Sequence, residues 1–128
     1  MFFAPCGSRV MTELNKRREA VRLRLLRLLS EKPNASTREM AAYLGISNGA
    51  AYYLLKALID KGFIKAQRFS KSNQKAAYFY VITPSGIKQK LRLTEKFLDI
   101  KRAEYNQLYA EIEAMEADLI DAQLGKTQ

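Results

Sequence analysis

The sequence predicts a mainly α-helical protein with a small β-hairpin, in which a winged helix-turn-helix is followed by a long C-terminal coiled-coil helix. Three observations predict this fold class. Residues 36–62 read as two short helices on either side of a glycine-containing corner. Residues 63–82 then read as two strands joined by a polar turn, and residues 84–123 carry a sustained heptad-like apolar repeat.

The order of these features divides the 128 residues into four segments. They are an irregular N-terminal segment (1–12), a winged helix-turn-helix domain (13–83), a long dimerisation helix (84–123) and a tail (124–128). A chain of this length is large enough for one domain with an extension.

Residues 13–31 form the first predicted helix, which ends before Pro33. Its apolar side chains repeat at helical spacing and are expected to pack on the two following helices to form a three-helix core. They are Leu14, Val21, Leu25, Leu28 and Leu29. The many arginines of this helix are interpreted as a solvated face, with a phosphate contact and a membrane-surface helix as the alternatives.

The next two helices begin and end at recognisable capping residues. Ser36 followed by Glu39 is a capping-box pattern, which predicts a helix start at Ser36. Gly45 can adopt the left-handed conformation that ends this helix, and Ser47 can cap the next one. A helix-turn-helix is therefore predicted, whose second helix would be the recognition helix.

On a helical wheel the segment 47–61 has two distinct faces. The expected core face consists of Ala51, Leu54, Leu55 and Leu58. The opposite face and its flanks consist of Asn48, Gly49, Tyr52, Tyr53, Lys56 and Asp60. For Tyr52, completion of the core remains an alternative to exposure.

A β-hairpin is predicted from residues 63–69 and 77–82, which are rich in aromatic and branched side chains. The loop between them contains no acidic residue and would serve as the wing, whose polar and basic side chains can reach a phosphate backbone or a minor groove. These side chains are Arg68, Lys71, Ser72, Asn73, Gln74 and Lys75. A merely soluble loop tip is the alternative.

The final helix is predicted to begin at Pro84 with Thr83 as its cap. A helix of about 38 residues would span nearly 60 Å, which is too long for this small domain to cover, so its outer half is expected to pair with a second copy of the chain. The expected dimerisation residues are Leu98, Tyr105, Leu108, Ile112, Met115 and Leu119. Acidic side chains would repel in a tight parallel pair, which leaves an antiparallel pair or packing against the arginine-rich first helix open.

Composition and charge exclude several classes of protein. The chain has no histidine and one cysteine, Cys6, which argues against a zinc site, a histidine-dependent catalytic group or a disulfide, and favours a cytoplasmic location. No nucleophile-and-base pair or glycine-rich phosphate loop indicates an enzyme, and neither a cofactor nor a membrane segment is expected. The formal net charge is +9, with 21 basic and 7 acidic residues in positions 1–102. This distribution favours a polyanionic partner.

The segment from Gly45 to Lys65, followed by the wing and by ITPSGIKQKLRLTEKFL, resembles the MarR-type winged helix-turn-helix. Residues 82–86 closely match that family's leucine, threonine, proline, any residue, glycine motif, with Ile82 at the leucine position. Residues 21–113 resemble more narrowly the short MarR-like regulators associated with bacterial exopolysaccharide gene clusters. The wing departs from the pattern, because Asn73, Gln74 and Lys75 stand where many MarR-type proteins carry an aspartate and arginine pair.

The resemblance implies a homodimeric transcription regulator that binds double-stranded DNA, with an inverted-repeat operator as the expected target. In the recognition helix it assigns DNA contacts to Ser47, Asn48, Gly49, Tyr52, Tyr53 and Lys56. The preceding helix is expected to contribute Thr37 and Arg38. Asparagine and tyrosine side chains suit base edges, whereas lysines and arginines suit phosphates. No small-molecule effector can be named, although related proteins often bind phenolic ligands.

A protein-interaction adaptor with only non-specific DNA affinity is the alternative function, because winged helices are also used to bind proteins. The concentration of positive charge in residues 1–102 favours DNA. An adaptor would bind DNA weakly and without regard to sequence.

Overall fold

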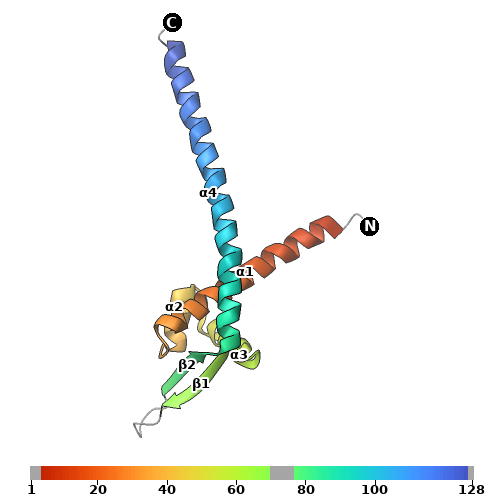
Figure 1. Ribbon diagram of the computed structural model, residues 1–128, viewed down its shortest axis with the longest axis vertical. Helices are drawn as coiled ribbons and strands as arrows, with labels where there is room; N and C mark the ends of the chain where they lie inside the picture. The colour runs from red at the N-terminus through yellow and green to blue at the C-terminus, as the bar shows by residue number, and fades with distance from the viewer. Residues whose placement is uncertain (1–3, 70–76, 127–128) are drawn as a thin grey trace. The chain divides into compact units, whose positions relative to one another are not determined.

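The computed structural model describes residues 4–69 and 77–126, which form four helices and a two-stranded antiparallel sheet (Figure 1). In chain order these elements are α1 (Ala4–Glu31), α2 (Thr37–Leu44), α3 (Asn48–Asp60), β1 (Ile64–Phe69), β2 (Ala77–Ile82) and α4 (Pro84–Lys126). The predicted fold class is confirmed: a helix-turn-helix, a hairpin and a long C-terminal helix follow one another in the expected order.

The chain divides into two compact units within α4, between Thr94 and Glu95. The sequence places a boundary between residues 83 and 84, at the start of α4, whereas the first turns of α4 belong to the compact unit that contains the winged helix-turn-helix. No helix among the described residues is both long enough and apolar enough to cross a membrane.

The N-terminal segment differs from the prediction. The sequence predicts an irregular segment over residues 1–12, yet α1 already begins at Ala4. Proline is tolerated in the first turn of a helix, and a single interior glycine costs only about 1 kcal/mol, so neither Pro5 nor Gly7 ends this helix. Its C-terminal end agrees with the prediction, because α1 stops at Glu31, ahead of Pro33.

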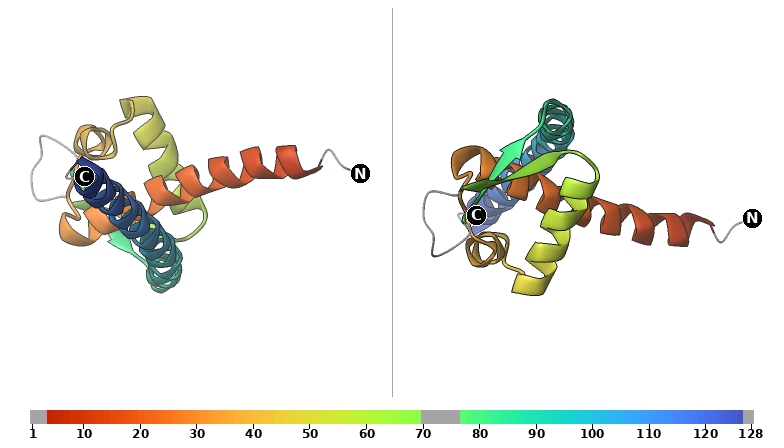
Figure 2. Two further views of the ribbon diagram at one scale, coloured as in Figure 1. Left: turned by 90° about the horizontal axis from the view of Figure 1, so that it is seen from above. Right: turned by 90° about the horizontal axis from the view of Figure 1, so that it is seen from below.

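The hydrophobic core is built around the C-terminal half of α1, which lies among α2, α3 and the hairpin (Figure 2). Leu25, Leu26 and Leu29 are almost completely buried there. The predicted stripe is partly wrong, since Leu14 is 41% exposed and Leu26, which the stripe omits, is fully buried. The buried arc is wider than one stripe because α1 contacts α2 on one side and β2 on another.

Both predicted caps of the helix-turn-helix are present. Ser36 Oγ accepts a hydrogen bond from the backbone N–H of Glu39 at 3.1 Å, and the Glu39 carboxylate accepts one from the backbone N–H of Ser36 at 3.2 Å. Gly45 has a φ of 71° and donates its N–H to the carbonyl of Ala41 at 2.8 Å. Glycine suits this position because a left-handed conformation costs it little.

The hairpin pairs Ile64 with Ile82 and Phe69 with Ala77 at its two ends. The outer edge of β2 is also occupied, because the N–H of Tyr80 donates a hydrogen bond to the carbonyl of Pro33 at 2.9 Å. The connection between α1 and α2 is therefore joined to the middle of β2 by a backbone hydrogen bond.

A tight junction joins the end of α3 to the start of α4. Thr83 Oγ1 donates to the carbonyl of Gly62 at 2.5 Å and accepts from the N–H of Gly86 at 3.1 Å. Ser85 Oγ also donates to the Gly62 carbonyl, at 3.0 Å. A Cβ on Gly86 would lie only 2.1 Å from the carbonyl oxygen of Phe63, so only glycine allows this close backbone approach. The Thr-Pro-Ser-Gly sequence is therefore explained by the junction that it forms.

Candidate nucleic-acid interface

The outward face of α3 carries the polar and aromatic side chains that the helical wheel predicts. Ser47 caps the helix, since its Oγ accepts a hydrogen bond from the N–H of Ala50 at 3.1 Å. Ala51, Leu55 and Leu58 are buried on the core side. Exposed residues on the other side include Asn48, Gly49, Tyr52, Tyr53, Lys56 and Asp60. In helix-turn-helix proteins the second helix presents such an exposed face to the major groove.

Two tyrosines on this face are far more exposed than a core role would allow. Tyr53 is 79% exposed and Tyr52 is 57% exposed, so the alternative in which Tyr52 completes the core is not what the structure shows.

Tyr52 nonetheless lies near the hairpin. Burial raises the pKa of Tyr80 above its usual value, and the neighbouring Tyr78 and Tyr52 raise it further. The rings of Tyr78 and Tyr80 stack with their centroids 6.3 Å apart.

The start of α2 contributes the second predicted group. Arg38 is exposed, whereas Thr37 is half-buried. Beside them, the Lys32 ammonium group donates a hydrogen bond to the Glu39 carboxylate. This bond is the main reason why the pKa of Glu39 lies below its usual value, and the bond from the Ser36 backbone lowers it further. Lys32 is therefore engaged with Glu39, whereas Arg38 at the same helix start is exposed.

The wing is only partly within the described residues. Arg68 is exposed on β1, and Lys65 and Gln67 on the same strand are exposed as well. The other predicted wing residues lie outside the described residues and remain predictions: Lys71, Ser72, Asn73, Gln74 and Lys75. The predicted wing residues begin at Arg68 and do not include Lys65, although the strand that leads to the turn also carries this exposed basic side chain.

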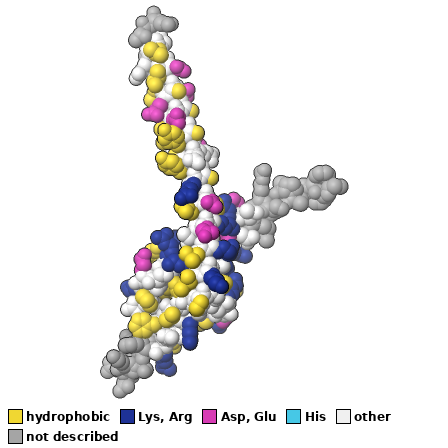
Figure 3. Space-filling model, viewed as in Figure 1, with side chains coloured by type: hydrophobic (Ala, Val, Ile, Leu, Met, Phe, Trp, Pro, Cys, Tyr) yellow, Lys and Arg dark blue, Asp and Glu magenta, His cyan; other side chains and the backbone are white. Residues whose placement is uncertain are grey.

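Charge and apolar surface are separated along the chain. Lys and Arg side chains gather over the winged helix-turn-helix unit, whereas the C-terminal half of α4 carries hydrophobic and acidic side chains (Figure 3). Its predicted dimerisation residues are all exposed in the single chain, and more apolar side chains than predicted accompany them. The exposed set includes Leu98, Tyr105, Leu108, Tyr109, Ile112, Met115, Leu119, Ile120 and Leu124. An apolar surface of this length on one helix is typical of a protein contact.

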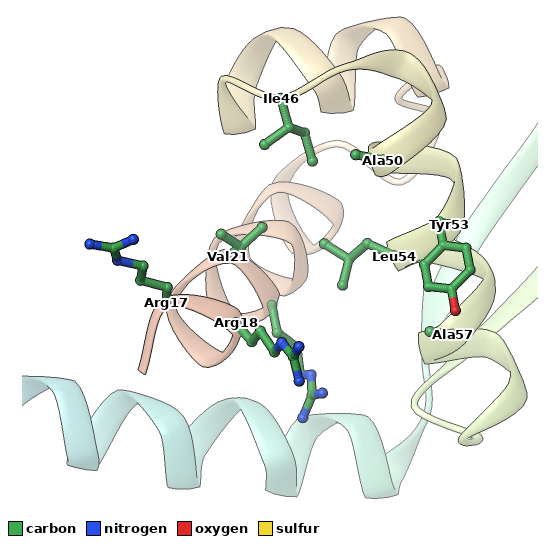
Figure 4. Close-up of a pocket in the computed structure, with 9 residues that line it drawn as sticks. Arg17, Arg18, Val21, Ile46, Ala50, Tyr53, Leu54 and Ala57 are labelled. Carbon is green, nitrogen blue, oxygen red and sulfur yellow. The ribbon is translucent and has the colours of Figure 1, made fainter. Parts of the chain in front are cut away.

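A groove between α1 and α3 was not predicted at all. It has a volume of about 620 Å³. In Figure 4, Val21 and Leu54 face each other across it, and Tyr53 stands at its rim. Its full lining consists of Arg17, Arg18, Val21, Arg22, Ile46, Ala50, Tyr53, Leu54 and Ala57. The sequence offered one signal, the arginines of the first helix, but their position beside α3 depends on the packing of the two helices.

Comparison with known proteins supports the same architecture. A family model described as winged helix-turn-helix DNA-binding matches residues 18–65, from within α1 to the start of β1. A search of curated proteins finds no match. Several solved structures are similar in fold at low sequence identity, and three proteins illustrate this.

The PcaV transcriptional regulator from Streptomyces coelicolor, solved with its natural ligand, has a TM-score of 0.59 at 17% identity, covering 84% of this chain and 74% of PcaV. A mutant of Staphylococcus aureus MepR has a TM-score of 0.59 at 18% identity, covering 100% of both chains. A second MepR mutant, bound to an oligodeoxyribonucleotide, has a TM-score of 0.53 at 18% identity, covering 100% and 99%. A MarR/EmrR family transcriptional regulator from Acinetobacter sp. ADP1 has a TM-score of 0.54 at 18% identity, covering 77% and 73%. At these identities the likeness establishes the fold.

Proposed function

We propose that the protein is a sequence-specific DNA-binding transcription regulator of the MarR type that acts as a homodimer in the cytoplasm. The observation that carries this proposal is the outward face of α3, whose polar and aromatic side chains are exposed to solvent. The basic character of the surrounding unit and the match to a winged helix-turn-helix DNA-binding model support it. So does the likeness in fold to MepR, one structure of which holds an oligodeoxyribonucleotide.

The proposed contacts divide into two classes. Asn48, Tyr52 and Tyr53 would meet base edges in the major groove, because asparagine can pair with adenine and a tyrosine ring can pack on a thymine methyl group. The remaining positions near the start of α3, Ser47 and Gly49, would bring the backbone close to the DNA. Such contacts would confer sequence preference.

Phosphate contacts would come from Lys56 on α3, Arg38 with Thr37 on α2, and Arg68 on β1. The loop beyond Arg68 would add Lys71 and Lys75 and, as polar neighbours, Ser72, Asn73 and Gln74. These contacts would position the protein without reading sequence, and each would add to the salt dependence of binding.

A homodimer would present two recognition helices to one inverted repeat, with half-sites about one helical turn apart. The exposed apolar side chains of α4 from Leu98 to Leu119 supply the surface for that association. The resemblance to short MarR-like regulators adds exopolysaccharide biosynthesis genes as the proposed target.

The experiment that tests the proposal is selection of bound fragments from the source genome by the purified full chain near physiological salt. Enriched fragments are then compared with scrambled duplexes of the same composition. Enrichment of one inverted-repeat motif is the expected result, and the genes beside it test the exopolysaccharide assignment. Uniform recovery of all fragments with a steep salt dependence would refute the regulator and favour a protein-interaction adaptor.

A further inference from the structure

The groove between α1 and α3 combines an apolar floor with a positively charged rim (Figure 4). Val21, Leu54 and Ala57 contribute apolar surface, and Arg17 and Arg18 stand on the α1 side. A site that binds only phosphate needs hydrogen-bond donors but no apolar surface. A groove with both features suits an amphipathic segment that has one apolar and one acidic edge.

The rim of the groove is formed by arginines of α1. Neither Arg17 nor Arg18 forms an ion pair with any residue in the described part of the chain. The Nε of Arg22 is buried and finds no hydrogen-bond acceptor among those same residues. Arg24 provides the contrast, because it donates to the carbonyl of Tyr43 at 2.6 Å. Buried donors are normally paired, so the Arg22 Nε is open to an acceptor that the described residues do not supply.

The chain carries a segment with the matching chemistry in the C-terminal half of α4. The apolar row there consists of Leu108, Ile112, Met115 and Leu119. An acidic row at seven-residue spacing runs beside it and consists of Glu104, Glu111 and Asp118. Side chains three and four residues apart are neighbours on a helix surface, so the two rows form one continuous face. Both rows are exposed in the single chain.

Pairing this face with itself is unfavourable in either direction. If the apolar row forms the contact of a parallel coiled coil, Glu111 lies at a position that flanks this contact. It then faces Glu116 of the other helix. In an antiparallel pair the same row meets itself, so that Glu111 faces Glu111 or Glu104. Like charges are therefore brought together by self-pairing, whereas the groove would place the acidic row against arginines.

We propose that, in the homodimer, residues 104–119 of α4 from one protomer occupy the groove between α1 and α3 of its partner. The apolar row covers the groove floor, and the acidic row lies beside the rim arginines. This inference rests on the homodimer of the proposed function and specifies its contact. Because Tyr53 belongs both to the groove and to the outward face of α3, assembly of the dimer also braces the recognition helix.

Exchange of charge between the two surfaces tests the proposal. One full-length variant carries R17E with R18E, and the other carries E104K with E111K. Each is examined by sedimentation velocity without DNA. In each homodimer both contacts pair like charges, so we expect the dissociation constant to rise at least about tenfold, as for coupled charges in contact. In the mixture one contact is native and the other is reversed but complementary, so a heterodimer should form with nearly native affinity.

Matched controls change the same charge away from the proposed contact. R27E with K88E alters exposed cations outside the groove, and D99K with E113K alters the opposite side of the helix from the acidic row. Both controls should dimerise like the unmodified chain. Formation of the heterodimer also proves that the two test variants fold.

Several results would overturn the proposal. They are a monomeric unmodified chain, a groove variant that still dimerises normally, or a mixture that does not recover. A groove variant that stays dimeric but loses DNA affinity would assign these arginines to phosphates instead. The outcome is independent of the genomic selection. If the mixture recovers dimerisation but the selection enriches no motif, the contact is sustained and the regulator is refuted. If the selection enriches a motif but the mixture does not recover, the regulator is sustained and the contact is refuted.

Discussion

Replacement of Gly86 by alanine should destabilise the winged helix-turn-helix unit strongly, although alanine is the better helix former. The new Cβ would lie 2.1 Å from the carbonyl oxygen of Phe63 and 2.8 Å from a methyl carbon of Ile82. The oxygen belongs to the backbone and cannot rotate away. It also accepts a hydrogen bond from the N–H of Thr83 at 3.0 Å, so that any movement weakens this bond.

The magnitude follows from three contributions. Overpacking a filled site costs about 1–3 kcal/mol, and weakening one backbone hydrogen bond adds about 0.5–1.5 kcal/mol. The higher helix propensity of alanine returns up to about 1 kcal/mol. The net loss in the free energy of unfolding is therefore about 1–3 kcal/mol.

Urea unfolding followed by tyrosine fluorescence and circular dichroism, at one protein concentration, measures this loss. With an m-value of about 1–3 kcal/mol per molar, a loss of about 2 kcal/mol lowers the midpoint by about 1 M. The matched control is Gly49→Ala, because a Cβ there meets nothing within 4 Å. It should unfold within about 0.5 kcal/mol of the unmodified chain. Equal midpoints for the two variants would refute the account of the junction.

Four further outcomes are expected. Tyr53→Ala should lose discrimination between the selected motif and a scrambled duplex more than it loses overall affinity, and equal losses on both would contradict a base contact. Lys56→Ala should weaken binding to both duplexes alike and reduce the slope of log affinity against log salt by about 1. Because the pKa of Glu39 is lowered from 4.5, its stabilisation is present above that pH and is lost as the pH falls through the folded value. The stability difference between the unmodified chain and Glu39→Gln should therefore shrink below about pH 4.5 in urea titrations, and a constant difference would refute this assignment. A chain truncated after Ile100 should sediment as a monomer, whereas a remaining dimer would place the contact elsewhere.

Local features were the ones that the sequence predicted well. The caps at Ser36, Ser47 and Thr83 form as expected because each depends on residues within three positions of one another. The core face of α3 agrees at Ala51, Leu55 and Leu58, which follow a single helical period, whereas the predicted Leu54 is only half-buried and lines the groove. These features require no knowledge of the rest of the fold.

Features that depend on packing were missed or misjudged. The single stripe predicted for the first helix omitted Leu26, because that helix is covered on more than one side. The sequence matched the family motif around Gly86 but did not give its cause, which is the approach of the Phe63 carbonyl from a different element. The groove beside Arg22 likewise exists only after α1 and α3 have packed.

The position of α3 is fixed independently of its outward face, and this makes that face a good place to test function. The corner at Gly45 and the Ser47 cap hold its start, Leu55 and Leu58 anchor its core side, and Thr83 binds the Gly62 carbonyl just beyond its end. None of these interactions involves the exposed residues proposed to read bases. Substitution of an exposed side chain that makes no core contact usually changes stability by less than about 0.5 kcal/mol. A loss of sequence discrimination in Tyr53→Ala would therefore not report on unfolding. Because Tyr53 also lines the groove, sedimentation of this variant separates a lost DNA contact from a weakened dimer.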